Sequence, residues 1–258
     1  MTASELPFDM SHYLEIDNAR MQHLDLIDIG CQGKTLLDVG CGIGRFSDYW
    51  ASKGCKVLGI DARETNIRMM RERYPYIDAV TANVESEPFV QVGTFDIVFC
   101  YGLLYHTENP TCVLRNLAAV TKEALLLETA ISISNEAIVK FALEGPGDDQ
   151  ALRSIACRPS ERYLIMILAE CNFPYIYMPT VWPQHPQFSR HAYTGRGKTV
   201  GGNLTRTIMI ASRLPIENPL LALADDRSFA RQRGQLEYVA YGVRRKLEGK
   251  IWCNAMPT

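Results

Sequence analysis

Three glycines and one acid near residue 40 are the residues whose types and spacing could most directly do chemistry. Gly40, Gly42 and Gly44 alternate with other residues and directly follow the apolar stretch 36–39, which contains Asp38. Because glycine has no Cβ, a loop of this composition can turn sharply and bring its backbone into contact with a ligand. The pattern therefore predicts a buried strand that ends in a ligand-binding loop.

Asp38 indicates which kind of ligand binds there. A dinucleotide places its pyrophosphate at a helix N-terminus, and a carboxylate at that place would repel it. S-adenosylmethionine has no phosphate, and its sulfonium and ammonium groups are attracted by a carboxylate. The spacing agrees, because Arg45 stands where a dinucleotide motif has its third glycine. The sequence therefore favours a methyl donor, and a nicotinamide-dependent dehydrogenase is the alternative that binding of a reduced nicotinamide would support.

Two further polar residues follow later strands. Asp61 ends the stretch 55–61, and Asn83 follows residues 77–82. A carboxylate at the end of the second strand can accept hydrogen bonds from a ribose diol, although it can also cap the next helix. Asn83 can offer its amide to an adenine edge, or it can simply make a turn. Since parallel strands end at one edge of the sheet, these positions together predict a nucleoside site.

The elements that must position these residues alternate between strand and helix from residue 35 onward, which is typical of a parallel sheet covered by helices on both faces. We expect strands at 35–39, 55–61, 77–82, 95–100 and 124–129, with helices at 44–53, 63–74 and 111–121. Farther on we expect a short apolar helix within 130–157, a helix capped by Ser160, and strands at 173–181 and 205–212. The fold class is therefore α/β, doubly wound.

The chain is expected to have three parts. They are an N-terminal helical cover at 1–33, a main domain at 34–213 and a C-terminal helical tail at 214–258, with a helix over 225–250. The main domain contains a lid or insertion at about 130–160 and a substrate loop at 182–204.

Four segments together resemble the class I S-adenosylmethionine-dependent methyltransferases. They are DVGCGIG at 38–44, VLGID at 57–61, the turn at Asn83 and FDIVFCYGLLYH at 95–106. The resemblance covers roughly residues 30–130. It implies a seven-stranded sheet of order 3-2-1-4-5-7-6 with an antiparallel last strand, S-adenosylmethionine as cofactor and S-adenosylhomocysteine as product.

The resemblance also implies which residues hold the cofactor. They are Asp38, Gly40, Gly42, Asp61, Asn83 and the backbone of Cys100 and Tyr101. We add four neighbours to the expected cofactor site, namely Cys41, Gly44, Ala62 and Val84.

The acceptor is less clearly indicated than the cofactor. Within the class, residues 102–106, Pro110, 125–129 and 158–160 are similar to the core of bacterial tRNA wobble-uridine methyl or carboxymethyl transferases. However, the net charge of −2 gives no general attraction to nucleic acid, and no strongly basic face is evident outside the tail. We therefore expect methylation of an oxygen or nitrogen atom on a small polar acceptor, such as a sugar or secondary metabolite. A tRNA transferase and a non-catalytic S-adenosylmethionine-binding protein are the alternatives.

Candidate catalytic and substrate residues lie near the expected place of the sulfonium. His106 could take a proton from a hydroxyl acceptor, or it could pack beneath the cofactor or cap a helix. Tyr105 is the second catalytic candidate. The loop 182–204 opens on the same sheet edge and suits a polar acceptor, although it could also be an ordinary surface loop. The expected substrate-binding residues are Arg158, His185, His191, Tyr193 and Arg196.

Metal, membrane and secretion signals are weak or missing. The eight cysteines include no C-x-x-C pair and the histidines show no ligand spacing, so we expect reduced thiols and no metal. No stretch approaches the ~20 apolar residues of a membrane span, and residues 1–10 lack a signal pattern. We therefore expect a cytoplasmic enzyme without membrane contact, of open oligomeric state.

Overall fold

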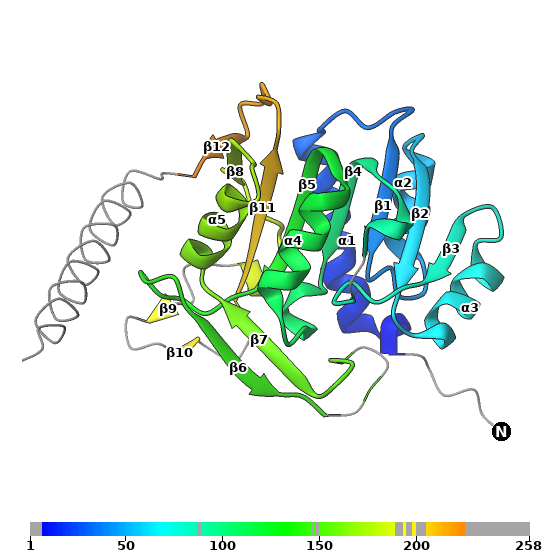
Figure 1. Ribbon diagram of the computed structural model, residues 1–258, viewed down its shortest axis with the longest axis horizontal. Coiled ribbons are helices and arrows are strands. Elements are labelled where there is room, and N and C mark those ends of the chain that lie inside the picture. Colours follow the sequence, from blue (N-terminus) through cyan, green and yellow to red (C-terminus); the bar gives the residue numbers. More distant parts are fainter. Residues whose placement is uncertain are drawn as a thin grey trace, which may run out of the picture. The chain divides into compact units, whose positions relative to one another are not determined.

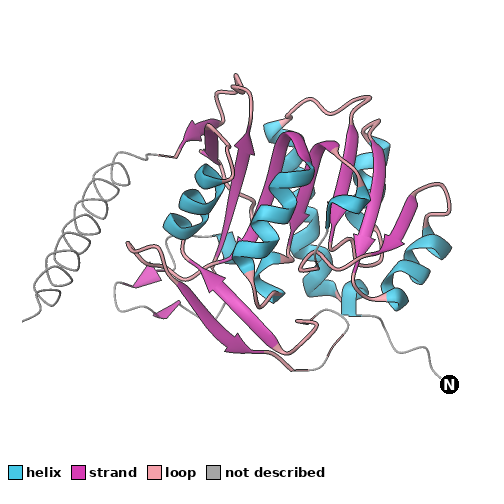
Figure 2. Cartoon of the chain, viewed as in Figure 1, coloured by secondary structure: helices cyan, strands magenta, loops and turns pink. Residues whose placement is uncertain are grey.

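The computed structural model describes residues 7–86, 89–145, 147, 150–188, 193–194, 198–199 and 205–224. Its helices and strands belong to one unit, Met1–Leu223. Figure 1 and Figure 2 show a central sheet with helices packed on both of its faces. The expected tail helix at 225–250 lies outside the described residues.

The sheet has eight strands in the order β3-β2-β1-β4-β5-β11-β8-β12. Their bounds are Thr35–Val39 (β1), Lys56–Asp61 (β2), Asp78–Thr81 (β3), Phe95–Tyr101 (β4), Thr121–Ala130 (β5), Tyr175–Pro179 (β8), Arg206–Ser212 (β11) and Leu221–Leu223 (β12). Strands β1 to β5 pair in parallel, and β11 is antiparallel to both β5 and β8. The doubly wound α/β class and the order 3-2-1-4-5-7-6 of the first seven strands are as expected.

The expected number of seven strands is wrong by one, because β12 pairs antiparallel with β8. Residues 221–223 fall in the stretch expected to be a helical tail, so that expectation is wrong at this point. Without β12, β8 would present a row of unpaired backbone groups at the sheet edge. Thr180 N–H also donates to Leu220 O at 2.8 Å, which continues this protection beyond the strand.

The described residues also form five α-helices and four short 3-10 helices. The helices are Ser11–Ile27 (α1), Arg45–Ser52 (α2), Glu64–Arg73 (α3), Pro110–Val120 (α4) and Glu161–Glu170 (α5). The 3-10 helices are Pro7–Asp9 (η1), Phe89–Val92 (η2), Leu104–His106 (η3) and Pro186–Phe188 (η4). Ser160 accepts a hydrogen bond from Tyr163 N–H at 3.2 Å, which confirms it as the cap of α5.

Helices α1 and α2 cover one face of the sheet, and α4 and α5 cover the other (Figure 1). On the first face, Ile16 and Leu24 of α1 and Trp50 of α2 are buried with Phe99 and Tyr101 of β4. Burial of one large apolar side chain stabilises a fold by about 1.5–3 kcal/mol. This packing fixes α1 directly beside the carboxyl ends of the central strands.

A hairpin stands where a short apolar helix was expected. Strands β6 (Val139–Leu143) and β7 (Ile155–Pro159) pair antiparallel and form a separate two-stranded sheet. A helix would need an apolar face to bury, but Phe141 is 60% exposed and Leu143 is 85% exposed. Pairing with β7 instead satisfies the backbone groups of this stretch. The substrate-loop stretch contains another pair of short strands, Tyr193–Thr194 (β9) and Lys198–Thr199 (β10).

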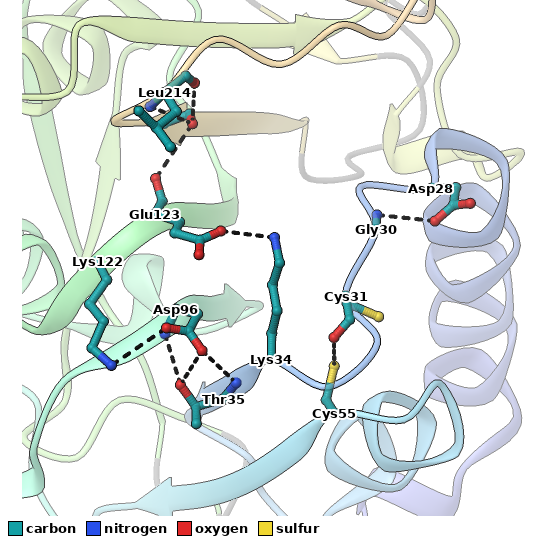
Figure 3. Close-up of polar contacts among 11 residues, drawn as sticks. Asp28, Gly30, Cys31, Lys34, Thr35, Cys55, Asp96, Lys122, Glu123 and Leu214 are labelled. Carbon is teal, nitrogen blue, oxygen red and sulfur yellow. Dashed lines mark hydrogen bonds and ion pairs between the residues drawn. The ribbon is translucent and has the colours of Figure 1, made fainter.

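The amino ends of the central strands are held by polar contacts at the edge opposite the glycine loop (Figure 3). The carboxylate of Asp96, in β4, accepts hydrogen bonds from the N–H and hydroxyl of Thr35 at 2.8 and 2.7 Å. Lys34 and Glu123 form an ion pair at 2.8 Å that links the starts of β1 and β5. These contacts fix the relative register of β1, β4 and β5, whose other ends carry the candidate site.

Candidate functional site

A cavity of about 790 Å³ lies at the carboxyl ends of the parallel strands. Its walls come from the glycine loop after β1, from α1, from the segment after β4, from the β6–β7 hairpin and from η4. Eight of the expected site residues line it: Gly40, Cys41, Gly42, Tyr101, Tyr105, His106, Arg158 and His185. Sequence positions spread over most of the described chain therefore meet in one cavity.

The other expected residues do not line this cavity. They are Asp38, Gly44, Asp61, Ala62, Asn83, Val84 and Cys100. His191 and Arg196 lie outside the described residues, and Tyr193 is described only by its backbone in β9.

The glycine loop needs its glycines for conformation and for close packing. Gly40 and Gly44 have φ angles of 76° and 91°, in the left-handed region that other residues rarely adopt. A Cβ on Gly40 would lie 2.9 Å from the Leu103 side chain, and one on Gly44 would lie 2.7 Å from Met70. The loop can therefore turn between β1 and α2 while its backbone stays on the cavity wall.

Asp38 lies beneath the loop and not at its mouth. The residue is part of β1 and is 2% exposed, and its carboxylate accepts a hydrogen bond from Ser47 Oγ at 2.5 Å. Burial raises the pKa of Asp38 to about 7, although the Ser47 hydroxyl acts in the opposite direction. Any effect of this acid on a cationic ligand must therefore act across the loop.

Asp61 connects the glycine loop to the start of α3. One carboxylate oxygen accepts a hydrogen bond from Gly42 N–H at 3.1 Å, and the other accepts from Arg63 N–H at 2.8 Å and from Asn66 Nδ2 at 3.2 Å. Burial raises the pKa of Asp61, while these hydrogen bonds oppose the rise. The acid thus contacts the residues at the start of α3, but it is not the cap of that helix as its alternative reading supposed, because the capping position is Arg63 and has no side-chain capping hydrogen bond.

Asn83 makes the turn that was its alternative role. Its side-chain oxygen accepts a hydrogen bond from Glu85 N–H at 2.9 Å, two residues later.

A buried charge cluster forms the other end of the site. Glu128 of β5 is fully buried between Arg20 of α1, at 2.6 Å, and Arg206 of β11, at 3.0 Å. Arg206 also donates to the Tyr105 hydroxyl at 3.0 Å. Burial raises the pKa of Glu128, but the two guanidiniums outweigh burial and hold that pKa below its ordinary value. Glu128 is therefore an ion-pair member, and both arginines reach the cavity wall.

Sequence reasoning did not select Arg20 or Arg206 as site residues. Arg206 is a charged residue at the start of the apolar run 206–212, and Glu128 interrupts a similar run in β5. A charge in a buried strand needs a partner of opposite charge, so the sequence did indicate that Glu128 and Arg206 are paired with something. The sequence could not show which distant residue each of them pairs with.

Three buried polar atoms of cavity-lining residues have no hydrogen-bond partner among the described residues. They are the hydroxyl of Tyr101, Nε of Arg20 and Nε of Arg45, which lies 3.8 Å from a carboxylate oxygen of Asp17. Buried polar groups in folded proteins are nearly always hydrogen-bonded. These three donors therefore fit a cavity that receives a polar ligand.

His106 is held by an acid from the hairpin. Its Nδ1 lies 2.5 Å from Oε2 of Glu144, which follows β6. The other oxygen of Glu144 lies 3.2 Å from Arg158 of β7, and Arg158 also donates to the backbone oxygen of Tyr105 at 3.0 Å. The structure thus brings His106, Tyr105 and Arg158 together as expected, and it adds Glu144, which sequence reasoning missed.

The described residues contain neither a metal-binding cluster nor a membrane-spanning helix. In that part of the chain, no group of three or more His, Cys, Asp and Glu side chains is placed to hold a metal ion. No helix within the same residues is long and apolar enough to cross a membrane.

Comparison with known proteins gives partial sequence matches. A family described as a methyltransferase domain matches residues 37–125. The ubiquinone biosynthesis O-methyltransferase of Bordetella avium is 33% identical over 111 residues, which cover 42% of this chain and 46% of that protein. The protein of the same name from Nitrosomonas europaea is 30% identical over 112 residues, covering 42% and 48%. The match thus spans less than half of these curated relatives.

Solved structures share the fold over most of the chain. The N-terminal domain of EvdMO1, in the presence of SAH and D-fucose, aligns with a TM-score of 0.59 and 22% identity, covering 79% of this chain and 84% of that one. Magnesium protoporphyrin IX methyltransferase from Synechocystis PCC 6803, with bound SAM, aligns with a TM-score of 0.51 and 20% identity, covering 78% and 83%. The matched residues 37–125 form the glycine-loop half of a sheet with the strand order expected of class I S-adenosylmethionine-dependent methyltransferases, so this part of the chain is a methyltransferase domain of that kind.

Proposed function

We propose that this chain transfers a methyl group from S-adenosylmethionine to an oxygen atom of a small polar acceptor, such as a sugar or another polyhydroxylated metabolite. One observation carries the proposal: a single cavity is bordered by the glycine loop and also by Tyr105, His106 and Arg158. Methyl transfer needs donor and acceptor in one water-poor space, with the reacting atoms about 3 Å apart. The names of the curated relatives, which are O-methyltransferases, support an oxygen acceptor over a nitrogen acceptor.

The residues on the glycine-loop side fit the cofactor. The backbone of Gly40 and Gly42 borders the cavity, and Asp61, which lies behind the loop, holds it in place through the Gly42 N–H. The unpartnered Nε of Arg20 and hydroxyl of Tyr101 would donate to the carboxylate of the amino-acid part. When bound, the cofactor supplies a methyl group already activated on a sulfonium. The protein's task is therefore mainly to position the acceptor, which can lower a barrier by roughly 7–11 kcal/mol.

His106 would remove the proton of the acceptor hydroxyl. Its Nδ1 is engaged by Glu144, so Nε2 is the nitrogen free to take a proton. Arg158 and Tyr105 flank this position, with the Arg158 guanidinium 5.1 Å from the centre of the Tyr105 ring. Their polar groups would orient a hydroxylated acceptor, and the hairpin beside them would restrict water.

The test is a transfer assay with S-adenosylmethionine that carries a deuterated methyl group. The purified protein is incubated with a panel of polyhydroxylated small molecules and, separately, with bulk tRNA, and mass spectrometry follows the label and the S-adenosylhomocysteine formed. We expect label in a small-molecule product, and loss of transfer in His106→Ala with retained S-adenosylhomocysteine binding. Label only in tRNA nucleosides would contradict the proposed acceptor class.

A further inference from the structure

We infer that Glu144 is the positioning residue for His106: from the β6–β7 hairpin, its carboxylate holds the imidazole with Nε2 presented to the acceptor. This inference rests on the proposed function, in which His106 takes the acceptor proton. It assigns a role to a residue outside the central sheet, on the same hairpin that carries Arg158.

The carboxylate of Glu144 is fixed at both oxygens. Oε2 contacts His106 Nδ1 at 2.5 Å and accepts a hydrogen bond from Ala151 N–H at 3.0 Å. Oε1 accepts from Nη2 of Arg158 at 3.2 Å. The side chains of His106 and Glu144 are only 13% and 10% exposed, so little water competes for these contacts. A carboxylate held in this way cannot turn from the imidazole without breaking other bonds.

This contact determines the tautomer of the imidazole. Burial favours the protonated form of Glu144, but the hydrogen bonds from His106, the Ala151 N–H and Arg158 outweigh burial and hold the pKa of Glu144 at about 2. Near neutral pH the carboxylate is therefore an acceptor only, so a neutral imidazole must carry its proton on Nδ1. Nε2 then has a lone pair and can accept a proton, and the nearby carboxylate stabilises the imidazolium that forms.

The hairpin that carries Glu144 is docked on the site at two places. On the acceptor side, Arg158 of β7 donates to Tyr105 O at 3.0 Å, and Cys157 Sγ lies 3.3 Å from Leu104 O. On the cofactor side, Arg63 donates to Gly147 O at 3.0 Å and to Gln150 O at 2.8 Å. Arg63 directly follows the loop residue 62 and bonds to Asp61 through its N–H. Docking of the hairpin therefore places Glu144 beside His106.

The first test reads the imidazole directly and needs no acceptor. Nitrogen-15 NMR of the His106 ring is recorded for the wild type, Glu144→Ala and Glu144→Gln. We expect the neutral ring of the wild type to be protonated at Nδ1, and the ring of Glu144→Ala to shift toward the Nε2-protonated form. Glu144→Gln keeps an oxygen that can accept from Nδ1 and should retain the wild-type tautomer. A wild-type ring protonated at Nε2 would overturn the inference.

The matched control is Glu108→Gln. Glu108 pairs with Arg153, which precedes β7, at 2.9 Å, and that arginine side chain is 70% exposed. This variant removes another acid paired with the hairpin region, but it does not contact His106, so the spectrum of the ring should not change. Far-UV circular dichroism reports whether each variant is folded, and the isosteric Glu144→Gln carries the test if Glu144→Ala does not fold.

The second test separates turnover from binding. We expect Glu144→Ala to lower kcat roughly 10- to 100-fold, part of the gain that a well-placed base supplies. Glu144→Gln should lose less, and the affinity for S-adenosylhomocysteine should stay within about twofold of the wild type in both, because Glu144 acts on the acceptor side. If the wild type binds S-adenosylhomocysteine and turns over, a normal kcat in Glu144→Ala would refute the positioning role alone. A wild type that does not bind S-adenosylhomocysteine would refute the proposed function, while the NMR result would still decide how Glu144 orients the ring.

Discussion

The ion cluster around Glu128 allows a sharp prediction about stability. Its carboxylate lies 2.6 Å from Arg20 and 3.0 Å from Arg206, and the three side chains are 0%, 7% and 6% exposed. Glu128→Gln keeps the size of the side chain but leaves two buried guanidiniums without this counter-charge. Removing the charge of one partner in a buried ion pair typically costs about 3–5 kcal/mol, so we expect the free energy of unfolding to fall by that amount.

Glu123 of the same strand provides the control. It pairs with Lys34 at 2.8 Å, but the two side chains are 40% and 34% exposed. Water and salt screen this pair, and Glu123→Gln should change the free energy of unfolding by less than about 1 kcal/mol.

The assay is reversible denaturation in urea, followed by tryptophan fluorescence and far-UV circular dichroism at pH 7. A loss of about 3–5 kcal/mol corresponds to a fall in Tm of roughly 6–20 °C for a chain of this size. If Glu128→Gln proves no more destabilising than Glu123→Gln, the cluster does not behave as a buried, mutually dependent set of charges, and the description of this end of the site is wrong.

Three further predictions concern the glycine-loop side. Burial raises the pKa of Asp38 to about 7, above its unfolded value of about 3.9. The stability that Asp38 contributes is therefore fully present below about pH 4 and is lost as the pH rises to about 7, by up to about 4 kcal/mol. Asp38→Asn should remove this pH dependence of the free energy of unfolding, measured by urea denaturation at pH 5 and pH 7. Asp61→Ala should weaken S-adenosylhomocysteine binding in calorimetry, because its carboxylate holds the glycine loop through the Gly42 N–H, and equal affinity would contradict this role. Gly44→Ala should lower the free energy of unfolding by about 1–3 kcal/mol in thermal denaturation, because its φ is 91° and its Cβ would meet Met70; an unchanged Tm would contradict the close packing.

The glycine-loop half of the fold could be predicted because its signals are local. The apolar run before Gly40, the acid at the end of β2 and the alternation of strands and helices each come from residues close in sequence. Their order in the sheet came from the family resemblance, since periodicity alone does not determine which strands are neighbours. The position of Asp38 was harder to predict, because only the structure shows that Ser47 of α2 covers its carboxylate.

The acceptor half could be predicted only in part because its contacts join distant residues. His106 and Arg158 were recognised by type and place, but Glu144 comes from a strand pair that was expected to be a helix, and the alternation of polar and apolar residues in β6 is too short to decide between the two. Arg20 and Arg206 meet Glu128 only because α1 and β11 converge on β5. The extra strand β12 has three residues, too few to give a period of its own.

Calorimetric titration of the purified protein with S-adenosylmethionine, S-adenosylhomocysteine and NADH tests the central claim most directly. The account predicts micromolar binding of the first two and none of NADH, because the loop after β1 carries an acid beneath it and Arg45 in place of a third glycine. Binding of NADH alone would contradict the assignment of this cavity to a methyl donor.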